Sequence, residues 1–300
     1  MKEMLELIKK GTTSLKEEGF NRTLNRSIEA IKQTGISSSS DDIRTIWIKG
    51  TNFGDQLTPY LIEKMTGKKP CKVNKYCFKT HYIMSGSIIS KANKHSIIYG
   101  TGMMNRDAEI KKPKKIFAVR GPLTRKRLLN IGHKCPKVFG DPGLLLPKYY
   151  TPNSKKEYEL GIIPHYIDYK FVRKNVSNSN EILIINILDP IEEVIEDINK
   201  CKKTISSSLH GLIASHAYGI PSTWVKFSEN LLRDDIKFFD YLNSVEIEGY
   251  PPTNFKENIP KLKKINEELK RKNAQPKMDT IQKLQTDLMS SNPFSNKGNF

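Results

Sequence analysis

The sequence predicts an α/β protein built from two parallel β-sheets, and three observations support that prediction. Short apolar runs alternate with helical patterns between residues 43 and 226, as βαβ units require. A polar stretch at 151–158 divides these units into two consecutive series. The length of 300 residues suits two ordinary domains. We therefore expect two Rossmann-like domains that face one cleft.

The first series is predicted to form an N-terminal domain over residues 44–152. Gly67 and Gly132 each follow a helical pattern and are expected to end it. Strands are expected at 43–49, 81–85, 96–99 and 116–120, and helices at 57–65 and 123–131.

The second series is predicted to form a C-terminal domain over residues 153–252. Its elements are again short apolar runs separated by helical spacing. Strands are expected at 160–163, 182–187, 204–206 and 222–226, and helices at 191–201 and 209–218.

Two segments flank the domains. Residues 1–43 have helical spacing and end in a polar serine run, which predicts a helical arm separated from the body. Residues 253–300 are expected to begin with a helix that has one charged face. The chain then becomes rich in Ser, Asn and Lys, which predicts a disordered tail.

The charge balance favours anionic partners. The chain has 50 Lys and Arg against 32 Asp and Glu, a net charge of +18, which suits phosphorylated small molecules, a membrane surface or nucleic acid. We expect no nucleic acid, because the chain lacks an RNA-binding aromatic motif and a zinc finger. Residues 111–137 hold ten Lys and Arg and no acidic residue. They form either a solvated face or a peripheral contact with an anionic membrane.

The cysteines and the N-terminus predict the compartment. The four cysteines are scattered, without a CxxC pair or a histidine cluster, so neither a zinc site nor a disulfide framework is expected. The apolar stretch at the N-terminus is too short and too charged for a signal peptide. No apolar run reaches the roughly 18 residues that a membrane span needs. We expect a cytoplasmic protein.

The first segment with chemical potential is Gly50–Asp55, between a predicted strand and a predicted helix. Ligands of open α/β sheets bind beyond the carboxyl ends of the strands. Gly54 could admit a ligand close to the backbone, and the helix start offers unpaired N–H groups. Asn52 and Asp55 are candidates for binding or catalysis, although both residue types are also ordinary helix caps.

Two further segments follow predicted strands. Arg120 closes the strand at 116–120 and could hold a carboxylate or phosphate through two parallel hydrogen bonds. Gly140–Gly143 is either a simple turn or the place where Asp141 orients a sugar hydroxyl.

The fourth segment, Ser206–Pro221, is the most informative. A short strand leads into a serine-rich turn and then a helix of small residues. Ser206, Ser207 and Ser208 could offer hydroxyl and N–H groups to an anion. His210 could contact a phosphate or act as an acid or base, or it could merely pack against the helix.

At these segments the chain resembles the polysaccharide pyruvyl transferase family. The resemblance extends over residues 44–245 and rests on six stretches, which follow one another with plausible spacing. They are NFGDQLTPYLIEK (52–64), FAVRGPLTRKRL (117–128), FGDPGLLLP (139–147), LGIIPHYID (160–168), SSSLHGLIASHAYGIPS (206–222) and IKFFDYL (236–242). The SSSLHGLI segment is the most specific of them.

The resemblance implies a fold and a reaction. The fold is a pair of Rossmann-like domains in a GT-B-like arrangement, with phosphoenolpyruvate bound between them. The reaction is transfer of pyruvate, as a ketal, onto a sugar or glycan of the cell envelope. The acceptor could be lipid-linked or nucleotide-linked, and no cofactor or metal is expected. A GT-B glycosyltransferase that uses a nucleotide sugar is the alternative.

The resemblance also implies roles for particular residues. Arg120 and His210 match the positions that bind phosphoenolpyruvate, and Lys237 stands where a basic residue is common. Asp55 and Asp141 match acidic positions of the family. In the implied chemistry His210 contacts the phosphate and is the candidate acid. Asp55 and His165 are the candidate bases.

Overall fold

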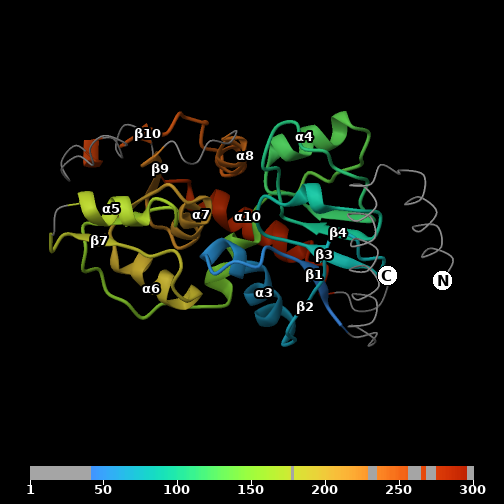
Figure 1. The fold of residues 1–300 in the computed structure, drawn as a ribbon, viewed down its shortest axis with the longest axis horizontal. Helices are drawn as coiled ribbons and strands as arrows, with labels where there is room; N and C mark the ends of the chain where they lie inside the picture. The colour runs from blue at the N-terminus through green and yellow to red at the C-terminus, as the bar shows by residue number, and fades with distance from the viewer. Residues whose placement is uncertain (1–41, 177–178, 229–234, 256–264, 268–274, 296–300) are drawn as a thin grey trace, which may run out of the picture.

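The computed structural model describes residues 42–176, 179–228, 235–255, 265–267 and 275–295. It contains two parallel β-sheets of five strands each, in two lobes that lie side by side (Figure 1). The α/β fold predicted from the sequence is confirmed, and the sheets are consistent with Rossmann-like domains. The GT-B-like arrangement stays a prediction. The arm at 1–41 and the tail at 296–300 lie outside the described residues.

The first sheet has the strand order β2-β1-β3-β4-β5, with every pair parallel. Two helices follow strands β1 and β5 of this lobe, and two 3₁₀ helices, η1 and η2, complete it. The bounds are β1 Arg44–Ile46, α3 Phe53–Thr66, β2 Cys71–Lys72, β3 His81–Ile83, η1 Ile89–Lys91, β4 Ser96–Tyr99, β5 Lys115–Ala118, α4 Pro122–Asn130 and η2 Pro142–Lys148.

The second sheet has the order β10-β9-β8-β6-β7 and is also parallel throughout. Its strands alternate with helices, and one more helix follows near the end of the chain. The bounds are β6 Leu160–Ile163, α5 Tyr169–Asn175, β7 Ile182–Ile184, α6 Ile191–Lys200, β8 Thr204–Ser206, α7 Leu209–Ala217, β9 Ser222–Lys226, α8 Ile236–Ser244, β10 Thr253–Asn254 and α10 Met278–Ser290.

Both sheets place their strands in the same sequence: second, first, third, fourth, fifth. In each sheet the chain therefore moves outward from the first strand, returns, and continues on the other side of it. The reversal leaves a crevice at the carboxyl ends of the first and third strands, where open α/β sheets bind their ligands. These switch points lie between β1 and β3 in one lobe and between β6 and β8 in the other.

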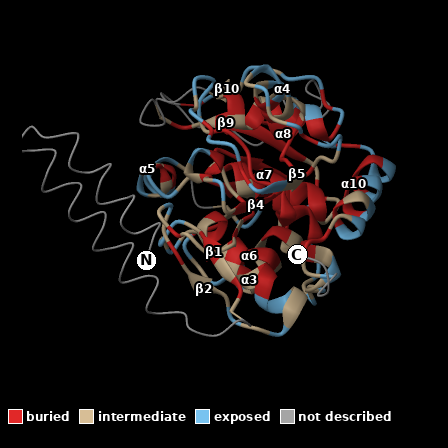
Figure 2. Ribbon diagram, turned by 90° about the vertical axis from the view of Figure 1, so that its right-hand side faces the viewer, coloured by how far each residue is buried: buried red, intermediate tan, exposed pale blue. Residues whose placement is uncertain are grey.

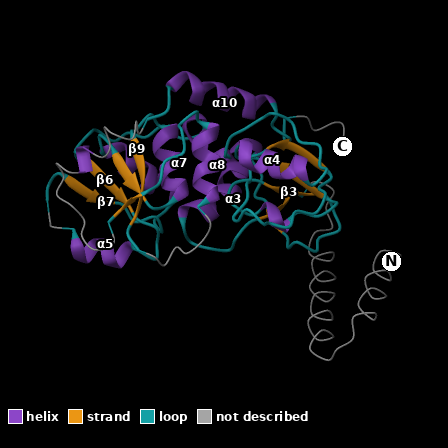
Figure 3. Ribbon diagram, turned by 90° about the horizontal axis from the view of Figure 1, so that it is seen from above, coloured by secondary structure: helices purple, strands orange, loops and turns teal. Residues whose placement is uncertain are grey.

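The lobes share one apolar core. Helices α3, α7 and α8 lie between the two sheets in the views of Figures 1 and 3. Helix α7 is buried along almost its whole length (Figure 2). One buried cluster contains Leu57 of α3, Leu212 of α7 and Tyr241 of α8 together with residues of both sheets. This core holds the two switch points at a fixed separation.

Helix α10 belongs to the folded body. It lies along one side of the molecule, over the region between the sheets (Figure 3). The Tyr99 hydroxyl donates to the Leu288 carbonyl at 2.8 Å, and the Gln285 amide donates to the Leu144 carbonyl at 2.9 Å. Residues 253–254, which were expected to begin a helix, instead form strand β10 of the second sheet, and the helix that follows at 278–290 packs on the N-terminal lobe.

Some strands are shorter than the apolar runs that predicted them. The run at 43–49 continues as a strand only to Ile46, and the run at 182–187 only to Ile184. Beyond β1 the chain leaves the sheet as a loop, which places Trp47 and Ile48 on the wall of a cavity. None of the helices in the described part of the chain has the length and apolar character that a bilayer crossing demands.

Candidate active site

A cavity of about 140 Å³ lies where the two switch points meet. It is lined by the segments that follow strands β1 and β3 of the first sheet and strands β6 and β8 of the second. Its polar lining residues are Asn52, Asp55, Thr58, Ser85, Ser87, His165, Ser208, His210 and Lys237. We call this cavity the inner chamber. Two consecutive βαβ series thus contribute equivalent edges to one site, as the sequence predicts.

A second cavity of about 420 Å³ adjoins the inner chamber, and we call it the outer chamber. Asn52, Asp55, His165 and Lys237 line both cavities. The outer chamber also has an apolar side, which includes the exposed side chains of Tyr166 and Ile167. A small polar ligand and a larger partner could therefore meet at these shared residues.

Two helices begin at the inner chamber. The Asn52 side chain caps α3 by accepting from the Asp55 N–H at 3.1 Å. The Ser208 hydroxyl caps α7 by accepting from the Gly211 N–H at 3.4 Å. A helix N-terminus carries partial positive charge and unpaired N–H groups, which attract anions. Both capping residues, Asn52 and Ser208, also line the chamber.

His210 lies in the first turn of α7 and reaches across to the N-terminal lobe. Its Nε2 atom is 3.1 Å from the Ser85 hydroxyl and 3.6 Å from a carboxylate oxygen of Asp141. Ser85 in turn donates to Asp141 at 2.7 Å. The imidazole is partly exposed, at 15% of its side-chain surface, whereas the carboxylate is fully buried. Asp141 can thus balance the charge of a protonated His210.

Asp141 acts through its neighbours, since it is not among the residues that line either chamber. Its carboxylate accepts from the N–H groups of Gly86 and Gly143 as well as from Ser85. Burial raises the pKa of this carboxyl, but the hydrogen bond and charge of His210 and the other donors outweigh burial and lower the pKa below its usual value. The residue that was expected to orient a sugar therefore holds His210 in the structure.

Gly54 is needed for contact with His210. A Cβ atom at this position would lie 2.1 Å from the His210 Nδ1 atom, far inside van der Waals contact. The close approach anticipated at Gly54 is thus made by a side chain of the other lobe.

We expect Gly54→Ala to push the imidazole away from Ser85 and Asp141 without unfolding the protein. A displacement of about 1 Å can cost about 100-fold in the rate of a reaction that depends on the displaced group, so the rate of any step that uses His210 should fall by roughly that factor. Initial rates with and without the substitution measure the effect. Gly67→Ala is the control for lost stability: a Cβ there meets nothing within 4 Å, but the φ of +67° strains any side chain, so this variant should be less stable and keep its rate. Full activity of Gly54→Ala would contradict the proposed contact.

Asp55 is half-buried between the two chambers. The Asn52 amide donates to its carboxylate. Burial raises the pKa of Asp55 above its usual value, against opposing effects of His210, Asn52, Lys91 and Lys72. A carboxyl whose pKa is raised can give and take a proton more readily near neutral pH.

His165 lies across the chambers from Asp55 and follows strand β6. Burial, together with the nearby charge of Lys237, lowers the pKa of His165 to about 4. The imidazole is therefore neutral near pH 7 and has a nitrogen that can accept a proton. Ser207 holds this turn in place, because its hydroxyl accepts from the His165 backbone N–H at 2.8 Å.

The three serines of the turn after β8 have different positions. Ser208 lines the inner chamber, whereas Ser206 and Ser207 are buried behind it. The Ser206 hydroxyl donates to backbone carbonyls. The Ser207 hydroxyl donates to Asp168 at 3.2 Å. All three are candidates for anion binding from the sequence, and of the three Ser208 is the one that lines the chamber.

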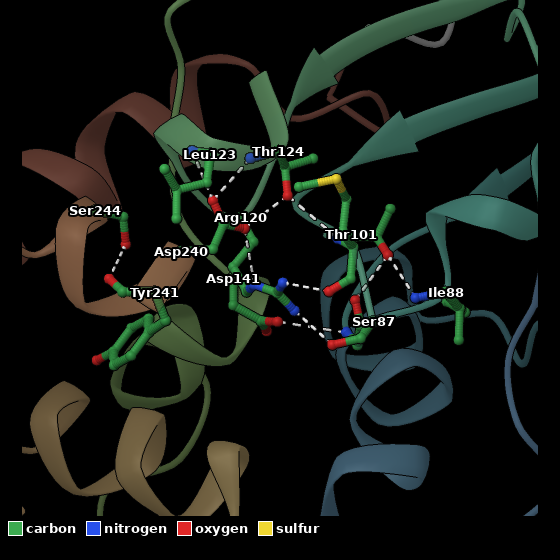
Figure 4. Close-up of polar contacts among 12 residues, drawn as sticks. Ser87, Ile88, Thr101, Arg120, Leu123, Thr124, Asp141, Asp240, Tyr241 and Ser244 are labelled. Carbon is green, nitrogen blue, oxygen red and sulfur yellow. Dashed lines mark hydrogen bonds and ion pairs between the residues drawn. The ribbon is translucent and has the colours of Figure 1, made fainter. Parts of the chain in front are cut away.

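Arg120, which the resemblance identifies as a residue that binds the donor, lies behind the chamber wall. Its side chain is fully buried, and its three nitrogens donate to Asp240 at 3.1 Å, Ser87 at 2.6 Å and the Met103 carbonyl at 2.7 Å (Figure 4). Ser87 lines the inner chamber, whereas Arg120 does not. Arg120 therefore supports the chamber wall from behind.

Asp240 of α8 organises this network. Its carboxylate accepts from the N–H groups of Leu123 and Thr124 and from the Thr124 hydroxyl, and so caps helix α4 (Figure 4). Sequence reasoning assigned no function to Asp240 or to Ser85. Asp240 lies inside the IKFFDYL stretch that supports the family resemblance, and that stretch is the sequence feature that could have pointed to it. Ser85 ends the expected strand at 81–85 and had no further signal.

Among the described residues, no group of three or more His, Cys, Asp and Glu side chains could hold a metal ion. The four cysteines are free.

Comparison with known proteins decides the family. The family model described as polysaccharide pyruvyl transferase matches residues 20–228, which include both switch points. This chain belongs to the polysaccharide pyruvyl transferase family. The chain is also 36% identical over 213 residues to an uncharacterized protein of Acanthamoeba polyphaga mimivirus, covering 67% of this chain and 74% of that protein. No solved structure matches this chain.

Family membership agrees with the geometry of the site. The polysaccharide pyruvyl transferase match contains every segment that lines the inner chamber except Lys237. At family level the chain is thus a transferase whose acceptor is a polysaccharide. Helices α8 and α10 lie beyond the match, although α8 carries both Lys237 and Asp240.

Proposed function

We propose that this protein transfers the pyruvyl group of phosphoenolpyruvate onto two hydroxyls of a sugar, forming a ketal. The observation that carries the proposal is the inner chamber, where two helix N-termini, His210 and Lys237 surround a space of about 140 Å³. Such a chamber suits a small and highly anionic molecule. Family membership adds that the transferred group is pyruvyl.

Phosphoenolpyruvate presents one phosphate and one carboxylate. The N-terminus of α7, with Ser208 and His210, is the best match for the phosphate, because backbone N–H groups and an imidazole can all donate to it. Lys237 and the start of α3, which also line the inner chamber, are proposed to receive the carboxylate. The donor itself supplies both the pyruvyl group and the leaving phosphate, so the proposed reaction needs no cofactor.

The proposed reaction begins with transfer of a proton from His210 to the methylene carbon of phosphoenolpyruvate. The double bond is consumed and C2 becomes an oxocarbenium-like centre. A sugar hydroxyl attacks C2 and gives up its proton, the bond from C2 to the phosphate oxygen breaks, and a second hydroxyl closes the ketal. Of the two hydroxyl protons, one replaces the proton lost by the acid and the other leaves with inorganic phosphate.

The acceptor sugar is proposed to occupy the outer chamber. Asp55 and His165 line both chambers, so either could take the hydroxyl proton at the point where donor and acceptor meet. At neutral pH His165 has an unprotonated nitrogen, because its pKa is lowered to about 4, so it can accept the hydroxyl proton. The exposed ring of Tyr166 offers an apolar surface to the sugar.

Phosphoenolpyruvate is expected to raise the thermal midpoint of the protein. A ligand that binds only the folded state stabilises it by about 2.7 kcal/mol at 100 times its dissociation constant. Lys237→Met should reduce the shift, because it removes a cation that lines the inner chamber. Lys112→Met removes an equal charge from an exposed position outside both chambers and should leave the shift unchanged.

Turnover is tested by incubating the protein with phosphoenolpyruvate and a panel of sugars. Release of inorganic phosphate together with a product heavier by one pyruvyl ketal would support the proposal. Hydrolysis or transfer from a nucleotide sugar, with no response to phosphoenolpyruvate, would instead favour a glycosyltransferase that uses the same inner chamber.

A further inference from the structure

A third cavity, of about 410 Å³, lies beside the inner chamber, and we call it the lysine pocket. It is formed beyond the carboxyl ends of β1 and β2, with η1 on one side. Four lysines line it: Lys49, Lys72, Lys75 and Lys91. Trp47 and Ile48 line both this pocket and the inner chamber, and Ile48 also lines the outer chamber. The three cavities are therefore neighbours.

The positive charge of the lysine pocket is only partly balanced. Within the described part of the chain, none of the four lysines forms an ion pair, and no acidic residue lines the pocket. Burial, followed by the charges of Lys49 and Lys91, lowers the pKa of Lys72. Burial and the charge of Lys75 lower the pKa of Lys91. The charge of Asp55 in the inner chamber opposes both shifts, but in each case it is a smaller effect than the neighbouring lysines, so an anion in the pocket would relieve their repulsion.

The shape of the site narrows the choice of anion. The lysines surround a concavity of about 410 Å³, which a single anion can enter so that several lysines contact it at once. Several clustered cations suit more than one negative charge. The donor phosphate is already accommodated in the inner chamber. Ile48 lines the lysine pocket and the outer chamber, where the acceptor sugar is proposed to bind. A phosphorylated group in the lysine pocket would therefore belong to the acceptor.

We propose that Lys49, Lys72, Lys75 and Lys91 bind the diphosphate of an acceptor in which the sugar is linked to a diphosphate. This inference rests on the proposed function, since it places the sugar in the outer chamber. The diphosphate could join the sugar to a nucleoside or to a lipid, and both share the chemistry that the lysines recognise.

The first experiment measures binding of inorganic pyrophosphate by calorimetry, without donor or turnover. Loss of one hydrogen bond to a charged group is expected to weaken binding about tenfold. The double variant Lys72→Met/Lys91→Met is therefore expected to bind pyrophosphate about 100-fold more weakly than the unmodified protein. The matched control is Lys112→Met/Lys126→Met, which removes the same charge from exposed positions outside the pocket. It should bind as the unmodified protein does.

Three results would overturn the inference. In the first, both double variants lose pyrophosphate binding equally. In the second, inorganic phosphate binds as tightly as pyrophosphate. In the third, Lys72→Met/Lys91→Met no longer binds phosphatidylserine vesicles but binds pyrophosphate as before. The midpoint shift caused by phosphoenolpyruvate is measured on the same variants and should persist. Failure of the lysine pocket is thereby distinguished from failure of the donor site.

Two soluble probes separate the sources of the diphosphate. Uridine diphosphate represents a nucleotide-linked acceptor and geranyl diphosphate a lipid-linked one. Tighter binding of one of them, lost in Lys72→Met/Lys91→Met, identifies the carrier and supports the inference. If neither probe competes with pyrophosphate, the pocket does not serve a diphosphate-linked acceptor.

Discussion

Replacing His210 by glutamine is expected to lower kcat for pyruvyl transfer by about 10²–10⁴-fold, the usual contribution of general acid catalysis. Glutamine can still donate to Ser85 and Asp141, but it cannot deliver a proton to the methylene carbon of the donor. The buried carboxylate of Asp141 would remain hydrogen-bonded to Gly86 and Gly143. The loss should therefore lie mainly in kcat. Initial rates of phosphate release at varied donor concentration provide the measurement.

The control for this prediction is His133→Gln. His133 lies just beyond α4, outside the lining of both chambers, and contacts the Ile110 carbonyl at 3.1 Å. Its substitution should leave kcat and KM unchanged. An unchanged kcat in His210→Gln would remove His210 from the role of acid, and Asp55 would then be the next candidate.

Replacing Asp240 by alanine is expected to destabilise the protein by about 3–5 kcal/mol, because it leaves the buried guanidinium of Arg120 without its carboxylate. Both side chains have no exposed surface. The N–H groups of Leu123 and Thr124 would also lose their acceptor, so helix α4 would lose its cap. Urea denaturation at neutral pH measures the change in the free energy of unfolding.

Glu159→Ala is the matched control for this second prediction. Glu159 also pairs with a cation, Lys202, but both side chains are well exposed, at 40% and 56%. Exposed ion pairs contribute up to about 1 kcal/mol, so this variant should be nearly as stable as the unmodified protein. If both substitutions lowered the free energy of unfolding equally, burial would not be the reason that Asp240 stabilises the protein. Arg120→Ala should resemble Asp240→Ala, so weaker donor binding in that variant would reflect a distorted wall.

Hydrophobic patterning predicted the elements that carry the site. The strands at 96–99, 160–163, 204–206 and 222–226 begin and end where the apolar runs do. The reason is physical: a strand buried on both faces of a parallel sheet favours apolar residues, as at 96–99 and 160–163, and the buried hydroxyls of Thr204 and Ser222 hydrogen-bond to each other. The order of strands within each sheet could not be predicted in this way, because periodicity does not report which strands pair.

The positions of individual site residues were less predictable. His210, Asp55 and Asn52 line the chamber because each begins a helix at the carboxyl edge of a sheet, and that rule is local. Arg120 also ends a strand at such an edge, but Asp240 pairs with it from 120 residues further along the chain. No residue near Arg120 in the sequence indicates that Asp240 is its partner. The positions of Ser85 and of the four lysines of the lysine pocket likewise depend on packing between segments that are far apart in the sequence.

The position of α10 has a consequence for how the protein is made. Its Leu288 carbonyl receives the Tyr99 hydroxyl across 189 residues of sequence. Domains generally fold as units while a chain is synthesised, N-terminal part first. Here the N-terminal sheet gains its last packing partner only after synthesis has passed residue 288. In the finished fold α10 covers the surface around Gly140 and Leu144. In a nascent chain that is halted earlier, this apolar surface would remain exposed, and chaperones could bind it.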